Sequence, residues 1–387
     1  MSLFDVYPLF DVTPDHAKDV YVYDAQGQSY LDLYGGHAVI SIGHSHPTYV
    51  EAITSQVSKL GFYSNAIQNP LQKQLSEKLA TLSGCEDYHL FLCSSGAEAN
   101  ENALKLASFH TQKSRVLAFK NSFHGRTSAA VAATDNAKII APLNAQQKVD
   151  FVEFEDLEAV EAILSKNETC AVIIECIQGV GGLDQCSTGF CKGLEQLCKT
   201  YNTVLIADEV QSGFGRSGDF FAFQNHHITP GIISIAKGMG NGFPVGGIMI
   251  HPDIKASHGL LGTTFGGNHL ACVAALSVLE VIENENLMDN AKARYRTFLN
   301  HAEAVSELKA TKGRGLMLGL EFNFPVATLR KNLLYKQRIF TGSSKNPNLI
   351  RILPPLSIKD MHWDLFFEAL HHELQEIKLH TTTNTAT

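Results

Sequence analysis

The chain has 387 residues, of which 44% are hydrophobic, and a mean hydropathy of −0.03, as expected for a soluble globular protein with one large domain and a smaller one. No apolar run approaches the roughly 20 residues of a membrane helix, and the first residues lack the charged and apolar regions of a secretory signal. The net charge of −8 and the scattered basic residues argue against a nucleic-acid partner.

The cysteines include no Cys-x-x-Cys pair, and several of them, such as Cys170 and Cys176, lie within apolar runs. Thiols of this kind are typical of the core of a reduced, cytoplasmic protein. We therefore predict no metal site, and we expect reduced thiols at all the cysteine positions, which are Cys85, Cys93, Cys170, Cys176, Cys186, Cys191, Cys198 and Cys272.

The N-terminal region contains a predicted hairpin and two histidines. Residues 20–33 alternate around a Gln-Gly turn, which is typical of a β-hairpin. His44 and His46 suggest a metal pair, but no third ligand stands at the spacing of a zinc protease. Structural histidines before a helix that begins at Pro47 are the better interpretation. A second helix is expected near 70–82.

A predicted anion site follows. The strand expected at 88–93 runs into Ser-Ser-Gly-Ala-Glu-Ala-Asn, and a helical pattern continues to about His110. A strand, a turn of small residues and a helix N-terminus form an anion site, because the first backbone N–H groups are free and the helix dipole favours negative charge. The simpler alternative is that Ser95 only caps the helix.

Two further strands end next to polar residues. The strand 115–120 leads into Asn-Ser-Phe-His-Gly-Arg, which contains Phe123 and Arg126. Alone this pattern is weak, and Arg126 is equally compatible with a surface ion pair. The apolar strand 170–175 ends at Glu175 and continues as Cys-Ile-Gln-Gly-Val-Gly-Gly.

The segment 213–218, Gly-Phe-Gly-Arg-Ser-Gly, formally matches the dinucleotide-binding pattern. That fingerprint requires the glycines to close a strand directly and to open a helix. Here Asp-Glu-Val-Gln-Ser intervenes after the strand 203–208, and Asp-Phe-Phe-Ala-Phe follows. We predict a loop, with nucleotide binding as a remote alternative.

Two apolar strands end in opposite charges, at Asp208 and at Lys237. A glycine-rich turn is predicted directly after Lys237, with Gly238, Gly240, Gly242, Gly246 and Gly247. An ammonium at the mouth of a buried strand is costly to desolvate, which lowers its pKa and makes it a nucleophile toward aldehydes. A lone lysine would more simply reach out to solvent. An opposite charge about one β-α-β unit upstream instead suggests a ligand across the carboxyl ends of a parallel sheet. Pyridoxal phosphate needs such a pair: a lysine for its aldehyde and a carboxylate for its ring nitrogen.

These motifs in series closely resemble those of the class III aminotransferases, which are fold type I pyridoxal-phosphate enzymes, and the resemblance extends through residue 375. It implies an α/β fold with a mainly parallel, helix-covered sheet. The large domain would span residues 48–280, the smaller α+β domain would combine 1–47 with 281–378, and 379–387 would be a disordered tail.

The resemblance also implies roles for individual residues. Lys237 would bond to the cofactor aldehyde and move protons, and Asp208 would hold the pyridine nitrogen. The cofactor phosphate, ring and 3-oxygen would contact Ser95, Gly96, Ala97, Phe123 and Gln211. Thr264, in Gly-Thr-Thr-Phe-Gly-Gly-Asn, would reach the phosphate of a neighbouring subunit, which implies a homodimer with shared active sites. Substrate would contact Arg126, Glu175, Arg351 and His37.

Within the class, the resemblance is strongest to members that move the terminal amino group of N-acetylornithine to 2-oxoglutarate, giving glutamate, in arginine biosynthesis. Enzymes for free ornithine carry a tyrosine where His37 stands, and its absence favours an N-acylated donor. N-succinylornithine is the alternative, and ornithine or 4-aminobutyrate are less favoured. A catalytically silent binding protein of this fold would be expected to lack Lys237 or Asp208, and both are present.

One position departs from the family. Val180 stands where the family has a glutamate that neutralises the second carboxylate-binding arginine, here Arg351. Arg351 would then need hydration or another acid, and Glu175 is the candidate.

Overall fold

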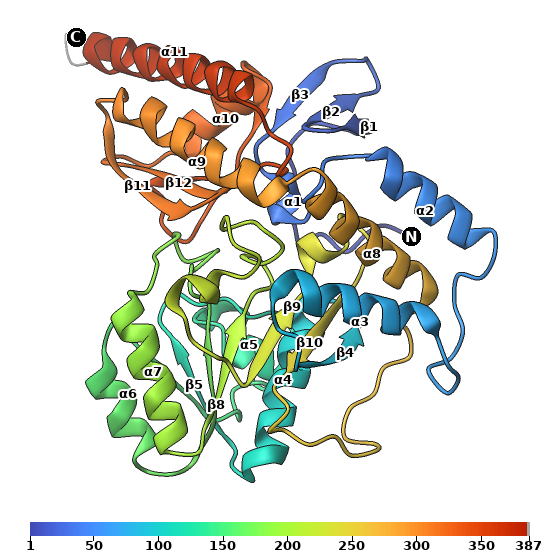
Figure 1. Cartoon of the computed structure of the whole chain (residues 1–387). Helices are drawn as coiled ribbons and strands as arrows, with labels where there is room; N and C mark the ends of the chain where they lie inside the picture. The colour runs from blue at the N-terminus through green and yellow to red at the C-terminus, as the bar shows by residue number, and fades with distance from the viewer. Residues whose placement is uncertain (385–387) are drawn as a thin grey trace.

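The computed structural model describes the backbone of residues 1–384 and the side chains of residues 1–379. Its central feature is a seven-stranded sheet (Figure 1). The strands follow the order β4 (His89–Cys93), β10 (Gly246–Ile250), β9 (Ile232–Ile235), β8 (Val204–Asp208), β7 (Thr169–Ile174), β5 (Arg115–Phe119) and β6 (Val149–Val152). Only β10 runs antiparallel to its neighbours, so the sheet is mainly parallel, as predicted.

Both faces of this sheet are buried, because alternate residues of each strand contribute to different hydrophobic cores. In β5, Val116 and Ala118 pack with helix α4 (Gly96–Thr111), whereas Leu117 and Phe119 belong to the core that includes helix α7 (Thr188–Thr200). The remaining helices around this sheet are α2 (Pro47–Val57), α3 (Pro70–Ser83), α5 (Ser128–Ala132), α6 (Leu157–Leu164) and α8 (His269–Asn284).

Two smaller sheets occupy the upper part of Figure 1. One contains β1 (Pro14–Lys18), β2 (Tyr21–Asp24), β3 (Ser29–Asp32) and β13 (Ile339–Phe340), and the other β11 (Leu308–Arg314), β12 (Met317–Phe322) and β14 (Leu349–Ile352). Helices α9 (Leu287–Glu303), α10 (Ala327–Tyr335) and α11 (Asp360–Asn384) accompany them. Because these sheets lie outside 48–280 in sequence, we propose residues 48–280 as one domain and 1–47 with 281–378 as the other.

Short elements complete the chain: α1 (Gly35–Ala38) and the 3₁₀ turns η1 (Ala137–Ile139), η2 (Ala222–His226) and η3 (Lys237–Met239). The segment 213–218 forms turns, as predicted. Within the described residues, no helix is long and apolar enough to cross a lipid bilayer.

Two expectations need correction. Gly246 and Gly247 were assigned to a turn, but they begin the strand β10. Glycine is needed there because a Cβ on Gly247 would lie 2.6 Å from the carbonyl oxygen of Phe91. The tail was expected to be disordered from residue 379, but α11 continues through Asn384, and residues 385–387 lie outside the described part of the chain.

The N-terminal histidines have structural partners, as predicted. Nε2 of His44 lies 2.8 Å from Oδ2 of Asp32, and Nε2 of His46 lies 2.9 Å from Oε1 of Glu285. Each histidine therefore ties its loop to a carboxylate of another element.

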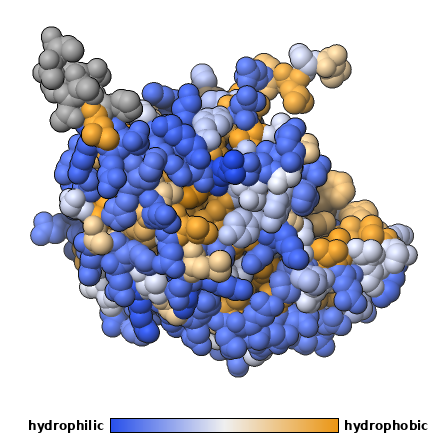
Figure 2. Space-filling model, turned by 90° about the horizontal axis from the view of Figure 1, so that it is seen from above, coloured by the Kyte–Doolittle hydropathy of each residue, from blue (hydrophilic) through white to orange (hydrophobic). Residues whose placement is uncertain are grey.

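Apolar side chains remain exposed on one side of the molecule. They come from α2 and the loop after it, and include Val57, Phe62, Tyr63 and Ile67. Figure 2 shows orange, apolar side chains at the right-hand edge, the side on which Figure 1 places α2.

Candidate active site

A cavity of about 350 Å³ lies at the carboxyl ends of the parallel strands β8 and β9. A volume of this order accommodates a small cofactor with part of a substrate. The cavity brings together nine of the predicted site residues: Ser95, Gly96, Ala97, Phe123, Arg126, Glu175, Asp208, Gln211 and Lys237. His37, Thr264 and Arg351 are not among its lining residues.

Lys237 directly follows Ala236 at the end of β9 and begins the turn η3 with a φ of 45°. This left-handed conformation turns the chain sharply where the strand ends. Burial lowers the pKa of the ammonium, and Arg351 lowers it further, while Asp208 and Glu175 oppose the shift. A larger fraction of the neutral amine, which is the nucleophilic form, follows.

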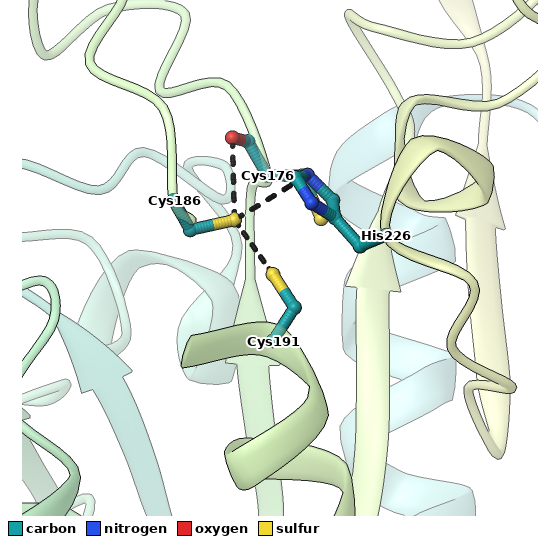
Figure 3. Close-up of side chains that lie close together, drawn as sticks. All are labelled: Cys176, Cys186, Cys191 and His226. Carbon is teal, nitrogen blue, oxygen red and sulfur yellow. Dashed lines mark hydrogen bonds between the residues drawn. The ribbon is translucent and has the colours of Figure 1, made fainter. Parts of the chain in front are cut away.

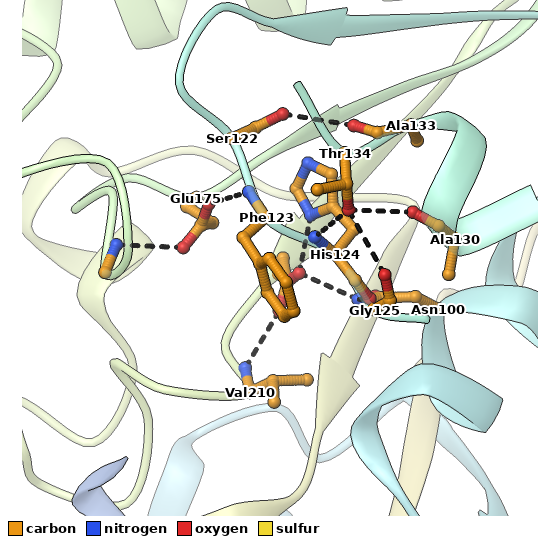
Figure 4. Close-up of polar contacts among 12 residues, drawn as sticks. Asn100, Ser122, Phe123, His124, Gly125, Ala130, Ala133, Thr134, Glu175 and Val210 are labelled. Carbon is orange, nitrogen blue, oxygen red and sulfur yellow. Dashed lines mark hydrogen bonds and ion pairs between the residues drawn. The ribbon is translucent and has the colours of Figure 1, made fainter. Parts of the chain in front are cut away.

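Asp208 ends β8 and is buried with three hydrogen-bond donors around it, from Asn100, His124 and Val210, which Figure 4 labels. Its Oδ2 lies 2.7 Å from Nδ1 of His124 and accepts from Nδ2 of Asn100 at 2.8 Å, and its Oδ1 accepts from the backbone N of Val210 at 3.1 Å. These partners were not predicted from the sequence. The motifs Phe-His-Gly-Arg and Ser-Gly-Ala-Glu-Ala-Asn contain His124 and Asn100, but their letters do not show that both reach the same carboxylate.

The predicted anion site is the N-terminus of α4. Oγ of Ser95 caps the helix by accepting from the backbone N of Glu98 at 3.2 Å. The first N–H groups of a helix have no partner inside it, and Gly96 and Ala97 supply two of them at the cavity wall. A Cβ on Gly96 would lie 2.6 Å from Cγ1 of Val210, so glycine permits close packing here.

Phe123 and Glu175 are joined through the backbone. Oε1 of Glu175 accepts from the N of Phe123 at 2.9 Å, and its Oε2 accepts from the N of Gly179 at 2.9 Å. Burial raises the pKa of Glu175, and Asp208 raises it further, although His124 and these amides oppose the shift. Arg126 is exposed at the cavity with its guanidinium carbon 5.9 Å from the ring centroid of Phe123, where it is accessible to an anionic substrate.

Arg351, in β14, is buried behind Gln211 and Gly179. Its Nε donates to the carbonyl of Ser343 at 2.5 Å, and its Nη1 donates to the carbonyl of Gly179 at 2.8 Å and to Oε1 of Gln211 at 3.3 Å. Burial lowers its pKa. Glu175 was the candidate acid for this arginine, but it acts on Arg351 through its charge, which raises the pKa of the guanidinium, while the hydrogen bonds recorded for Arg351 go to Ser343, Gly179 and Gln211.

His37 lies in a strained segment beside this arginine. The residues of α1 have φ values of 53°, 54°, 69° and 63°, and its two glycines reduce the cost of the left-handed turn. The carbonyl of His37 accepts from Nε2 of Gln211 at 3.2 Å, and Oη of Tyr34 lies 3.0 Å from its Nε2. Burial, followed by Arg351 and Lys237, lowers the pKa of His37 to about 4, so the ring is neutral near pH 7.

Thr264 is exposed on the segment between β10 and α8 and lies outside this chain's cavity. The ring of the adjacent Phe265 lies 5.5 Å from that of Phe62, which places this segment against the exposed loop after α2. The structure therefore leaves Thr264 on the surface, next to apolar side chains.

The residues present fit pyridoxal phosphate. The donor-rich helix N-terminus suits its phosphate, the buried carboxylate of Asp208 suits a protonated ring nitrogen, and the lowered pKa of Lys237 suits an amine that attacks an aldehyde. Phe123 and Val210 supply apolar surface for a ring.

Comparisons with known proteins agree with this site. The sequence matches the family described as Aminotransferase class-III over residues 5–374. It is 36% identical to the acetylornithine aminotransferase of Bacillus subtilis over 99% of each chain, and 39% identical to that of Methanocaldococcus jannaschii over 96% of each chain. The fold matches an ornithine aminotransferase of Toxoplasma gondii, a structure described with partial occupancy of PLP in its active site, with a TM-score of 0.88 and 26% identity over 96% of this chain and 92% of that one.

Proposed function

The chain belongs to the class III aminotransferases, and we propose that it moves the terminal amino group of N-acetylornithine to 2-oxoglutarate, giving glutamate, in arginine biosynthesis. The observation that carries this proposal is the pairing of Lys237 and Asp208 at the ends of adjacent parallel strands, in one cavity with the N-terminus of α4. Pyridoxal 5′-phosphate supplies an aldehyde that bonds amines and a ring that accepts electrons from the substrate carbon.

The protein's own residues would divide the remaining work. Asp208, oriented by His124 and Asn100, would hold a proton on the ring nitrogen. Nζ of Lys237 would take the proton from the amine-bearing carbon and return it one step later. Arg126, Arg351 and the neutral His37 would position the substrates, while Ser95, Gly96, Ala97, Phe123 and Gln211 would fix the cofactor.

The carboxylates of the cavity are already hydrogen-bonded within the protein, which favours an N-acylated amine substrate. Free ornithine carries a second ammonium, which needs an acidic partner when it is desolvated. Asp208 is occupied by His124, Asn100 and Val210, and Glu175 by two backbone amides. An N-acyl group removes that charge, and so fits these surroundings better.

The rate of glutamate formation with different amine donors tests this assignment. We expect kcat/KM for N-acetylornithine to exceed that for free ornithine and 4-aminobutyrate by about tenfold or more, which corresponds to about 1.4 kcal/mol. N-succinylornithine is included in the same series. A higher kcat/KM with ornithine or 4-aminobutyrate would reject the acylated donor, and preference for the succinyl compound would replace acetyl by succinyl.

We further propose a homodimer with shared active sites, acting in the cytoplasm, where all the free thiols of the described residues would stay reduced. The exposed apolar side chains around Thr264 support the dimer. Phe265 is 63% exposed and Ile67 is 57% exposed. Apolar patches of this kind are typical of protein interfaces.

Mixed dimers test whether Thr264 crosses the interface. If it does, a dimer of one Thr264→Ala chain and one Lys237→Ala chain carries both defects in one site and leaves the other intact. We therefore expect mixing to restore up to about half of the wild-type activity per mixed dimer. Turnover is measured on tagged, purified mixed dimers, with Thr263→Ala as the neighbouring control. Activity equal to that of the unmixed variants would contradict a shared site.

Val180 provides a test of Arg351. With valine at 180, Arg351 is held by neutral oxygens, so no carboxylate at that position competes with the α-carboxylate of 2-oxoglutarate once Gln211, which covers the arginine, moves aside. In Val180→Glu a charged hydrogen bond of about 1.5–3 kcal/mol would compete. The KM for 2-oxoglutarate should rise roughly tenfold or more. The KM for the amine donor should rise less. Val180→Gln has nearly the same shape without the charge and should change both KM values little. Equal effects of Val180→Glu on both substrates would contradict this role of Arg351.

A further inference from the structure

Three cysteines and a histidine from separate segments meet beneath the loop that follows Glu175 (Figure 3). Their ligand atoms, one from each of Cys176, Cys186, Cys191 and His226, all lie within 4.8 Å of one another. Sγ of Cys186 lies 2.8 Å from Sγ of Cys191 and 3.8 Å from Nε2 of His226. None of these residues lines the active-site cavity.

The fold holds these side chains in place from several directions. Cys176 follows β7, Cys186 precedes the cap of α7, Cys191 lies in the first turns of that helix, and His226 ends η2. The three cysteines are buried: the exposed fractions of Cys176, Cys186 and Cys191 are 2%, 4% and 0%. His226 is only partly buried, so the cluster is accessible from solvent on the side of this histidine. An ion therefore has a path of entry into an otherwise closed site.

The histidine is oriented as a metal ligand would be. Its Nδ1 lies 3.1 Å from Oγ1 of Thr188, on the first residue of α7. In the tautomer with its proton on Nδ1, the ring donates to Thr188 and the lone pair of Nε2 faces the sulfur of Cys186, as metal binding requires. Histidines that bind metals are held in this way by a hydrogen bond at their other nitrogen.

The surroundings also favour thiolate. The N-terminus of α7, with its positive dipole end, lies beside Cys186 and Cys191. Thiolate is the form of cysteine that binds metal ions.

The types of ligand atom in the cluster indicate which metal ion it would bind. Three thiolates and one imidazole form a Cys₃His set, which binds Zn²⁺ tetrahedrally with Zn–S near 2.3 Å and Zn–N near 2.0–2.1 Å, so that neighbouring ligand atoms lie about 3.5–3.8 Å apart. The observed separations of 2.8 Å, 3.8 Å and at most 4.8 Å bracket these values. A disulfide between Cys186 and Cys191 would need about 2.0 Å and would leave Cys176 and the oriented His226 unexplained.

We propose that Cys176, Cys186, Cys191 and His226 bind one Zn²⁺, and that this ion closes the base of the loop 176–186. All four positions would be filled by protein atoms, which makes the site structural, not catalytic. Binding releases up to three protons, one from each thiol, and leaves a site charge of −1.

The loop connects this ion to the active site. Cys176 and Cys186 stand at its two ends, where the N of Cys186 donates to the O of Cys176 at 3.2 Å. Within the loop, Gly179 donates its N–H to Glu175 and accepts from Arg351 through its carbonyl. Zinc would therefore stabilise the loop that holds these two side chains.

Metal analysis of the full chain, loaded with pyridoxal phosphate and purified without chelators from zinc-containing medium, tests the site. We expect about one zinc per chain in the wild type and at least about tenfold less in Cys191→Ser and His226→Ala. Cys198→Ser, which changes another buried cysteine of the same helix, should keep the full zinc content. Wild-type protein exchanged with Co²⁺ should show the visible bands of tetrahedral cobalt with thiolate ligands, which requires no variant to fold.

Three results would overturn the proposal. The first is wild-type protein that holds no zinc as purified and takes up none when incubated with ZnCl₂. The second is zinc that Cys191→Ser and His226→Ala retain at the wild-type level, since it would then lie elsewhere. The third is an intact mass lower by two hydrogens, with a Cys186–Cys191 disulfide in the peptide map of protein prepared without oxidant.

Discussion

Lys237→Ala is expected to abolish turnover while the fold survives. The change removes the amine that bonds the cofactor and carries the proton, and loss of a positioned proton carrier alone lowers kcat by roughly 10²–10⁴-fold. Stability should change little, because burial disfavours the ammonium, as its lowered pKa shows. Steady-state kinetics, with circular dichroism to check the fold, measure both effects.

The matched control for this prediction is Lys73→Ala, at a lysine whose side chain is 80% exposed on α3. It should keep wild-type kinetics. Intact transamination by Lys237→Ala would mean that another amine performs the chemistry and would overturn the assignment of this residue.

Asp208→Asn should fold and still bind cofactor but lose several orders of magnitude in rate. Without the carboxylate the ring nitrogen loses the charge that keeps it protonated, and a neutral pyridine accepts electrons poorly. In Asp208→Asn, the amide oxygen can still accept from His124 and Asn100. The NH₂ group then faces the backbone N–H of Val210, which is also a donor, so that hydrogen bond is lost. The rate is measured with saturating cofactor, which separates weak binding from slow chemistry.

Glu209→Gln is the control for Asp208→Asn. Glu209 is also a buried carboxylate, but it accepts from Ser212 and from the backbone of Ala222 and Phe223, and it does not line the cavity. Its neutralisation should leave the chemical rate near that of the wild type. Near-wild-type kinetics in Asp208→Asn would show that another group protonates the ring.

The main features of the fold, and the residues that meet in the cavity, were predictable because the signal is local. Strands such as β8 and β9 are almost wholly apolar runs, so the charges that end or follow them, Asp208 and Lys237, stand out in the sequence. The cap at Ser95 and the helix after it are equally local. The start of the strand β10 was not predicted, because glycines are also common in turns. In β10 they allow the neighbouring backbones to approach closely.

The contacts that complete the site depend on long-range packing. The carbonyls that hold Arg351 come from Gly179 and Ser343, which are brought together only by the loop after β7 and the small sheets. The cysteine cluster joins a strand end, a helix cap and a 3₁₀ turn, with no spacing that marks a metal site. Its three cysteines were therefore taken for ordinary core thiols.

Borohydride reduction followed by peptide mass spectrometry tests the central claim most directly. Reduction makes the bond between pyridoxal phosphate and its lysine permanent, so that the modified residue is read from the mass of its peptide. We predict the cofactor on Lys237 alone, and its release from Lys237 when N-acetylornithine is added before the reductant. A modification on another lysine, or none on protein saturated with cofactor, would contradict the account.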